Sequence, residues 1–402
     1  MTSLELARLS EICSLVTDGT HDSPKLRDDG VPFIKGKHIN TGRIEFDSCD
    51  FIAPEDHEKC IRRVKPQRDD ILMANIGASI GDCARVFDDR EFSIKNVALL
   101  RPDREKVAPS YFYQLVKSQI FQSRLMNLRL GAAQPYVSLE ALRRFEIPIV
   151  KDLESQCKIG EVFDSYDNLI ENNRRRIELL EQAARLLYRE WFVHLRFPGH
   201  EDVKIINGLP EGWKLSTVFD SIDILSGGTP KTDNAEYWGD QIPFFTPKDT
   251  GEFAYVNDTE KMITEIGLRN CNSRLYPKDT LFITARGTVG KLRLAQRPMA
   301  MNQSCYALNS KCRLTQHYLY FALSERVNHL KGQAGGAVFS AIVVDTFKKI
   351  PLLIPSSEMA DKFAKFASHT FSQIDVLSKQ IAQLTRARDL LLPRLMDGRI
   401  KV

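Results

Sequence analysis

The sequence predicts an α/β (α+β) fold in which two repeated mixed modules are separated by two long antiparallel coiled-coil helices, with pseudo-twofold symmetry. Three observations predict it. A pattern in residues 9–192 returns in residues 213–396. Short β-branched and aromatic runs, separated by turn residues, fill most of each copy. A heptad pattern without internal proline ends each copy.

The repeat is visible at single positions. Its period of more than 200 residues is too long for a solenoid, whose repeats span about 20–50 residues, and indicates a duplicated domain. A single shift of 204 joins Glu154 to Glu358 and Trp191 to Leu395 without a gap. Further upstream, a shift of 209 matches Asp70, Leu72, Ile80 and Gly81 with Asp279, Leu281, Val289 and Gly290.

Residues 9–150 and 213–355 are typical of mixed α/β modules. Residues 70–74 and 280–284 are apolar runs with the length of strands, and turn residues such as Ser226-Gly227-Gly228-Thr229-Pro230 separate these runs. One helix is expected near residues 109–128 and another near 316–331.

Residues 154–192 and 358–395 carry two apolar rows with a spacing of seven, which is the seam of a coiled coil over about four heptads. One surface helix per module is an alternative, but two matched heptad helices in one chain favour pairing with each other. The residues expected to pack along the seam are Phe163, Ile170, Asn173, Ile177, Leu180, Leu187 and Trp191 in the first helix, and Ile374, Leu377, Ile381, Leu384 and Leu391 in the second.

Polar residues on the seam, Asn173 and Arg388, are expected to fix the register of the pair. About 38 residues at ~1.5 Å each give a rod on the order of 55 Å long. Antiparallel pairing is expected to hold the two modules at opposite ends of this rod.

Four segments follow from these patterns. Residues 1–151 form the first module and residues 152–196 the first long helix. Residues 197–355 contain a turn-rich connector and the second module, and residues 356–397 form the second long helix.

Composition indicates an ordinary globular protein. The formal net charge is only +4, which excludes a polybasic tail but not basic faces. The 8 cysteines form no C-x-x-C pair and are expected to be reduced core thiols. No leader and no apolar run of membrane-spanning length is visible, so a cytoplasmic protein is expected.

No complete catalytic set is present. Gly287-Thr288-Val289-Gly290-Lys291 resembles part of a phosphate loop, but Leu292 stands where a magnesium-binding hydroxyl is needed. The sequence contains no G-x-G-x-x-G loop, and its 8 histidines are scattered. We therefore expect no catalytic residue and no metal site.

The loops, in contrast, carry side chains that hold phosphates and contact base edges. Both modules place such loops at matching positions but with different residues. This suggests that the two modules recognise two different DNA sequences. The candidate DNA-binding residues are Thr20, His21, Ser23, Lys25, Lys35, Lys37, His38, Asn75, Ser79, Gln134 and Tyr136 in the first module, and Thr229, Lys231, Thr232, Thr246, Lys248, Arg286, Thr288 and Lys291 in the second.

Several short motifs occur in a fixed order along the two copies of the repeat. They are Gly19-Thr20-His21-Asp22-Ser23-Pro24, Ile147-Pro148, Leu186-Leu187-Tyr188-Arg189-Glu190-Trp191-Phe192, Leu209-Pro210-Glu211-Gly212-Trp213, Gly227-Gly228-Thr229-Pro230-Lys231-Thr232, Tyr237-Trp238-Gly239-Asp240-Gln241-Ile242-Pro243 and Ile350-Pro351. In these motifs, over nearly its whole length, the chain resembles the specificity subunit of a type I restriction–modification enzyme. The resemblance is specific because the motifs are duplicated and occur in this order.

The resemblance implies two target-recognition domains, each reading one half of a bipartite site in double-stranded DNA, with the helices setting the gap. It also implies two modification (methyltransferase) subunits and the restriction subunits as partners. The subunit itself would be non-catalytic and hold no cofactor. S-adenosylmethionine, ATP and Mg would belong to the partners, and the assembled complex would methylate adenine N6 and cut DNA.

Two other classes stay open at this stage. A self-contained methyltransferase or nuclease would need motifs that the sequence lacks, and an assay with a labelled methyl donor distinguishes it. A non-DNA interaction scaffold with duplicated binding modules would show no salt-dependent DNA binding.

Overall fold

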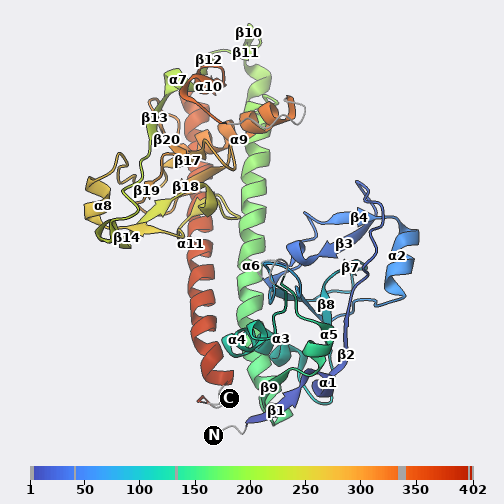
Figure 1. The fold of residues 1–402 in the computed structure, drawn as a ribbon. Coiled ribbons are helices and arrows are strands. Elements are labelled where there is room, and N and C mark those ends of the chain that lie inside the picture. Colours follow the sequence, from blue (N-terminus) through green and yellow to red (C-terminus); the bar gives the residue numbers. More distant parts are fainter. Residues whose placement is uncertain (1–3, 40–41, 132–134, 334–340, 397–398, 401–402) are drawn as a thin grey trace. The chain divides into compact units, whose positions relative to one another are not determined.

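The computed structural model describes residues 4–39, 42–131, 135–333, 341–396 and 399–400. The chain divides into two compact units (Figure 1). The first unit combines residues 1–170 with 382–402, and the second consists of residues 171–381. Each unit therefore contains one mixed α/β module and a stretch of both long helices.

The first unit contains three sheets. Its strands are β1 (Leu4–Arg8), β2 (Cys13–Asp18), β3 (Val31–Lys35), β4 (Asp50–Ile52), β5 (Ile71–Met73), β6 (Cys83–Arg85), β7 (Ser93–Lys95), β8 (Ala98–Pro102) and β9 (Glu146–Val150). The order β2-β8-β5-β6 forms an antiparallel sheet, and β4-β3-β7 forms a second sheet in which β3 and β7 are parallel. Strands β1 and β9 pair separately.

The predicted helix over residues 109–128 is wrong as a single element. The helices of the first module are α1 (Leu9–Ile12), α2 (Pro54–Ile61), α3 (Pro109–Lys117), α4 (Gln119–Met126) and α5 (Leu139–Arg143), with a 3-10 turn η1 (Gly36–His38). Ser118 separates α3 from α4 because its backbone is extended, with φ −63° and ψ 149°. Its hydroxyl accepts a hydrogen bond from the Phe121 amide at 3.3 Å and so caps α4.

The second unit repeats this strand order. Its strands are β12 (Lys214–Thr217), β13 (Ile222–Ser226), β14 (Trp238–Phe245), β15 (Tyr255–Val256), β16 (Met262–Ile263), β17 (Leu281–Thr284), β18 (Leu292–Ala295), β19 (Ala300–Met301), β20 (Cys305–Ser310) and β21 (Pro351–Ile354). The sheets are β13-β20-β17-β18-β15, β16-β14-β19 and β12-β21. They match the sheets of the first module strand for strand, with β15 added at one edge, so the predicted duplication and mixed α/β class are confirmed.

The remaining short elements belong to the second unit. They are α7 (Val218–Ser221), α8 (Glu265–Arg269), α9 (Gln316–Gln333), α10 (Val344–Lys348), the 3-10 turns η3 (His200–Asp202), η4 (Ala235–Tyr237) and η5 (Pro247–Asp249), and a connector hairpin of β10 (Ile205–Ile206) and β11 (Leu209–Pro210).

The predicted repeat register is off by one residue at β5 and β17, the first strands of the two central hairpins. The shift of 209 equated Leu72 with Leu281. However, Ile71 and Leu281 both pack in clusters with long-helix residues, whereas Leu72 packs on the opposite face of its sheet. A slip of one residue exchanges the faces of a strand, so Ile71 is the equivalent of Leu281. Nine residues lie between the paired Met73 and Cys83 and eight between the equivalent Ile283 and Leu292, which restores the shift of 209 by Gly81 and Gly290.

Two long helices, α6 (Leu153–Phe192) and α11 (Ser357–Met396), are present as predicted from the heptads, each with 40 residues rather than about 38. They lie side by side in each unit (Figure 1, green and red). In the second unit their pairing is antiparallel, because Asn173 Nδ2 donates to Gln380 Oε1 at 3.2 Å while the rings of Phe192 and Phe363 lie 5.2 Å apart. Pro393 lies inside the last turn of α11.

The residues predicted to pack along the seam differ in burial. Those that are buried are Phe163, Ile170, Asn173, Ile177, Ile374 and Leu377. Those that are partly buried are Leu180, Leu187, Trp191, Ile381, Leu384 and Leu391.

Candidate nucleic-acid interface

Three loops of the second module that were predicted to bind DNA lie next to one another. Loop 285–291 connects β17 to β18, and its Thr288 hydroxyl donates to the carbonyl of Pro247 at 3.2 Å. The Ala285 amide donates to Ser304 O at 2.7 Å, and the Gly228 amide donates to Met301 O at 3.2 Å. Backbone hydrogen bonds thus gather residues 227–232, 246–249 and 285–291 around the turn between β19 and β20.

Most of the predicted side chains on this surface are exposed. They are Thr229, Lys231, Thr232, Lys248, Arg286, Thr288 and Lys291. Thr246 is partly buried and donates to Asp249 Oδ2 at 2.7 Å, which closes the cap of η5. Lys248 Nζ lies 3.6 Å from Glu260. Arginine and lysine suit phosphate contacts, while the threonine hydroxyls can both donate and accept.

The corresponding loops of the first module also converge. The Thr20 amide donates to Ile94 O at 3.0 Å, and Lys35 lies beside Lys95 in the register of β3 and β7. Gly36 of η1 lies close to the Ser79 hydroxyl. Residues 19–25, 35–38 and 74–79 therefore share one end of the sheets, as their counterparts do.

Five predicted residues on this surface are exposed, namely His21, Ser23, Lys25, Lys37 and Tyr136. Lys35 and Ser79 are partly buried. The Asp50 carboxylate forms ion pairs with both lysines: its Oδ2 lies 2.7 Å from Lys35 Nζ and 3.6 Å from Lys37 Nζ. The hydrogen bond from Lys35 keeps the pKa of Asp50 below its usual value, so this carboxylate stays charged and offsets both lysines.

Three predicted residues are buried instead. Thr20, His38 and Asn75 expose only 6%, 2% and 5% of their surface. His38 Nδ1 accepts from the Lys35 amide at 3.1 Å, and burial lowers the pKa of His38, which favours the neutral ring. Asn75 Nδ2 donates to Val137 O at 3.1 Å, which ties the hairpin loop to the segment that presents Tyr136. Gln134 lies outside the described residues.

Two glycines, Gly19 and Gly228, allow the first loop of each surface to approach the backbone beside it, which is β7 in the first module and the bend after α8 in the second. A Cβ atom on Gly19 would lie 2.1 Å from Ile94 O, and one on Gly228 would lie 2.6 Å from the Asn272 amide. Backbone atoms cannot give way as a flexible side chain can, so both positions require glycine.

Sequence reasoning missed three polar residues that complete these surfaces. Lys95 donates to the Ser23 hydroxyl, Asn96 lies 2.8 Å from His21 Nδ1, and Gln303 accepts from Thr229. Lys95 ends β7, Asn96 follows it, and Gln303 follows β19; β7 and β19 are the strands parallel to β3 and β14. A sequence feature could have indicated them, because polar residues separate these short strands from β8 and β20.

Other classes of site find no support in the described part of the chain. No group of three or more His, Cys, Asp or Glu side chains in it could hold a metal ion. None of its helices is long and apolar enough to cross a lipid bilayer.

Comparison with known proteins adds the family. The family described as "Type I restriction modification DNA specificity domain" matches residues 2–182 and again residues 210–386. The MjaIX specificity subunit of a type I restriction enzyme from Methanocaldococcus jannaschii is 31% identical over 179 residues, which span 44% of this chain and 41% of that protein.

Two further relatives cover 90% or more of this chain. The HindI specificity subunit of a type I restriction enzyme from Haemophilus influenzae is 23% identical, covering 90% of this chain and 94% of that protein. The crystal structure of the S subunit of a type I restriction–modification system from M. genitalium shares the fold with a TM-score of 0.60 at 18% identity, covering 98% of this chain and 96% of that one. The chain therefore belongs to the type I restriction–modification DNA specificity family and carries its specificity domain twice.

Proposed function

We propose that this protein is the DNA-recognition subunit of a type I restriction–modification complex, in which each module reads one half of a bipartite site. One observation carries the proposal. The specificity domain occurs twice, and the same surface of each copy presents polar loops with different residues. Equal scaffolds with unequal loops suit the reading of two different half-sites in one DNA molecule.

The chemistry of both surfaces supports contacts to DNA. Exposed Lys25, Lys231, Arg286 and Lys291 can neutralise phosphates, a contribution that is independent of sequence and weakens with salt. Hydroxyl, amide and guanidinium groups can distinguish base edges in the major groove. Sequence preference would therefore come from the loops and overall affinity from the cations.

The long helices would set the gap between the half-sites and bind two modification subunits. In this proposal the chain is non-catalytic. S-adenosylmethionine, and ATP with Mg, would be bound by the modification and restriction subunits. Isolated full-length chain should accordingly show no methyl transfer, DNA cleavage or ATP hydrolysis.

Methylation mapping tests the recognition of a bipartite site. The chain is produced together with its modification subunit, and methylated adenines are mapped across a genome. We expect one bipartite motif. Exchange of residues 1–151 for the first module of another family member should change one half-site and leave the other unchanged. Simultaneous change of both half-sites would contradict independent readers.

A gel-shift experiment separates this proposal from a non-DNA scaffold. Affinity of the complex for mixed-sequence duplex DNA should fall steeply as salt rises, because phosphate binding releases counterions. Absence of any salt-dependent shift would favour the scaffold.

The spacer role has its own test. One heptad adds roughly 10 Å of helix. Insertion of one heptad after Leu180 and another after Leu384 should lengthen the gap and preserve both half-sites. A single insertion, which breaks the seam register, serves as the control. An unchanged gap in an active complex with both insertions would refute the spacer role.

A further inference from the structure

The central hairpin of each module contacts DNA-binding candidates at one end and a long helix at the other. The loops of β5–β6 and β17–β18 carry Asn75 and Ser79, and Arg286, Thr288 and Lys291. At the base of each hairpin, opposite the loop, the backbone forms the same hydrogen bond in both modules. The Asp69 amide donates to Val86 O at 2.9 Å and the Asp279 amide to Ala295 O at 2.8 Å, both with left-handed φ angles of 74° and 67°.

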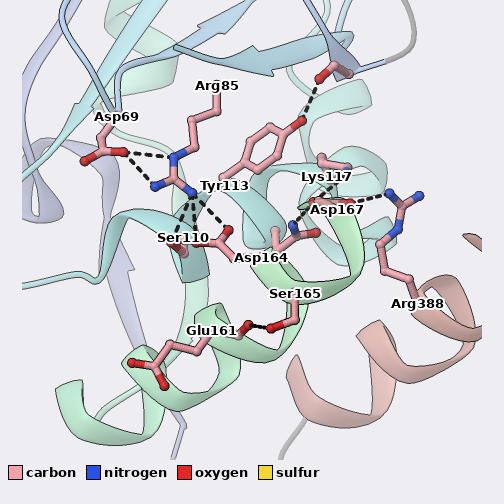
Figure 2. A network of polar contacts seen from close by, with 12 residues as sticks. Asp69, Arg85, Ser110, Tyr113, Lys117, Glu161, Asp164, Ser165, Asp167 and Arg388 are labelled. Carbon is pink, nitrogen blue, oxygen red and sulfur yellow. Dashed lines mark hydrogen bonds and ion pairs between the residues drawn. The ribbon is translucent and has the colours of Figure 1, made fainter. Parts of the chain in front are cut away.

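In the first module, Arg85 at the end of β6 joins this hairpin base to α6 (Figure 2). Its Nη1 donates to Asp164 Oδ1 and to Ser110 Oγ, each at 3.0 Å, while Nη2 donates to Asp69 Oδ1 at 2.7 Å. Ser110 Oγ in turn donates to Asp164 Oδ2 at 2.5 Å. The Arg85 side chain is only 11% exposed, and each of its nitrogens donates at least one hydrogen bond.

In the second module, Asp375 of α11 has the equivalent role. Its carboxylate accepts from Lys278 Nζ at 2.8 Å and from Gln296 Nε2 at 2.7 Å, and these residues flank β17 and β18. Burial alone would raise the pKa of Asp375, but these hydrogen bonds and that from Lys379 outweigh it, so its pKa lies below the usual value. The side chain is 11% exposed.

We propose that Asp164 and Asp375 are positioning residues for DNA recognition, each fixing the base of one hairpin on a long helix and thereby the place of the loop at its other end. The inference rests on the proposed function and deepens it by naming residues that govern sequence preference without touching DNA. Each residue governs one half-site only, because each carboxylate serves a single module.

Directional bonds explain why carboxylates suit this role. Apolar contacts hold the hairpin against the helix but tolerate small shifts, whereas hydrogen bonds to a charged group require a fixed geometry. A hairpin is short and twisted, so a small shift at its base displaces the loop. Base-edge contacts would suffer more from such a shift than phosphate contacts, because base readout depends on exact donor and acceptor placement.

The experiment measures base discrimination at each half-site. Full-length Asp164→Asn and Asp375→Asn variants are assembled with the modification subunit and tested on the wild-type site and on DNA with one base pair changed in either half. Asp164→Asn should lower discrimination about tenfold in the half-site of the first module alone. Asp375→Asn should do the same in the other half-site. Module exchange assigns the half-sites.

Matched controls are Glu161→Gln on α6 and Asp361→Asn on α11, both exposed carboxylates outside these contacts. Asp164→Glu keeps the charge and should recover part of the discrimination. If Asp164→Asn prevents assembly, Ser110→Ala takes its place in the test, because it removes one bond to the same carboxylate and one from Arg85 but leaves the Arg85–Asp164 contact.

Discrimination equal to that of the controls, or equal loss in both half-sites, would overturn the inference. A wild-type complex without any half-site preference would instead contradict the proposed function.

Discussion

The two modules share one scaffold but are joined to the long helices by different chemistry. The junction of the first module is ionic: Arg85 and Asp164 meet at its centre, and Asp167 of α6 accepts from Arg388 of α11 at 2.6 Å and from Gln114 of α3 at 2.7 Å. The junction of the second module has the Asp375 contacts at the base of its hairpin, but most of it is an aromatic cluster. There the rings of Tyr188 and Phe192 from α6 meet Tyr318 and Phe321 from α9 and Phe363 from α11.

One pair of equivalent positions shows the difference. Arg85 at the end of β6 corresponds to Leu294 of β18, which is fully buried in the apolar cluster of the second unit. An apolar junction tolerates loss of one contact by rearrangement. An ionic junction leaves an unpaired buried charge when one partner is lost, although exchange of all partners for apolar groups can be neutral. The same fold thus accepts either chemistry, with different sensitivity to mutation.

The largest effect is expected at the centre of the aromatic junction. Phe363 is fully buried, with five rings within 6.2 Å of its own. Phe363→Ala should lower the free energy of unfolding by about 3–5 kcal/mol through lost burial and a cavity. Chemical denaturation measures it. Phe366→Ala, on the exposed side of the same helix, is the control and should cost far less. A similar loss in both variants would contradict the aromatic centre.

Loss of the central arginine of the ionic junction should lower the free energy of unfolding nearly as much, but a second substitution should restore much of it. Arg85→Leu leaves Asp69 and Asp164 without their shared partner and should cost about 3 kcal/mol. Addition of Asp164→Leu should recover much of this loss, because the pair then resembles the apolar contact that Leu294 makes. Denaturation of the wild type, both single variants and the double variant gives the coupling. Strictly additive losses would mean that these side chains do not form one unit.

A smaller decrease in the free energy of unfolding is expected for a substitution where the two long helices meet in the first unit. Arg388→Leu removes the bond to Asp167, which keeps Gln114 and, at 3.9 Å, Lys117. The expected cost is about 1–2 kcal/mol, as for a hydrogen bond to a charged group. Thermal unfolding of this variant is compared with Arg386→Leu, which changes an exposed arginine two residues away. Equal melting temperatures of the two variants would contradict the role of Arg388.

The smallest effect concerns pH and the second module. Burial lowers the pKa of His317, and the negative charge of Asp279 only partly opposes this. As the pH falls below 6.5, His317 is therefore protonated more readily in the unfolded state than in the folded state. The wild type should therefore lose stability as pH falls below this value. His317→Gln should flatten that slope, measured from melting temperatures at several pH values, whereas exposed His369→Gln should keep it. An unchanged slope in His317→Gln would assign the pH dependence elsewhere.

Features of regular period were predictable from sequence. The heptads located both long helices because a seam repeats every seven residues, and the paired apolar runs located β5 and β17. The register of the repeat was not predictable to one residue, because Asp70 and Asp279 align well in sequence while Ile71 and Leu281 share the buried face. The break between α3 and α4 was not predictable either, because nothing in the sequence around Ser118 indicates that its backbone is extended.

The candidate site was predictable as loops but not as a surface. Loops at equal positions in both modules indicated where polar side chains gather. Asn75 donates to Val137, 62 positions along the chain, and the Arg85–Asp164 contact joins residues 79 positions apart. Such contacts leave no local pattern in the sequence.

The composition of the first unit has a consequence for synthesis on the ribosome. Its core includes Leu392, Leu395 and Met396, which are made after the whole second unit, a continuous segment that ends at residue 381. Domains generally fold as their chain emerges. Here the core of the module made first is completed only after the module made second has been synthesised. A nonsense mutation between residues 382 and 391 should therefore damage the earlier module and spare the later one.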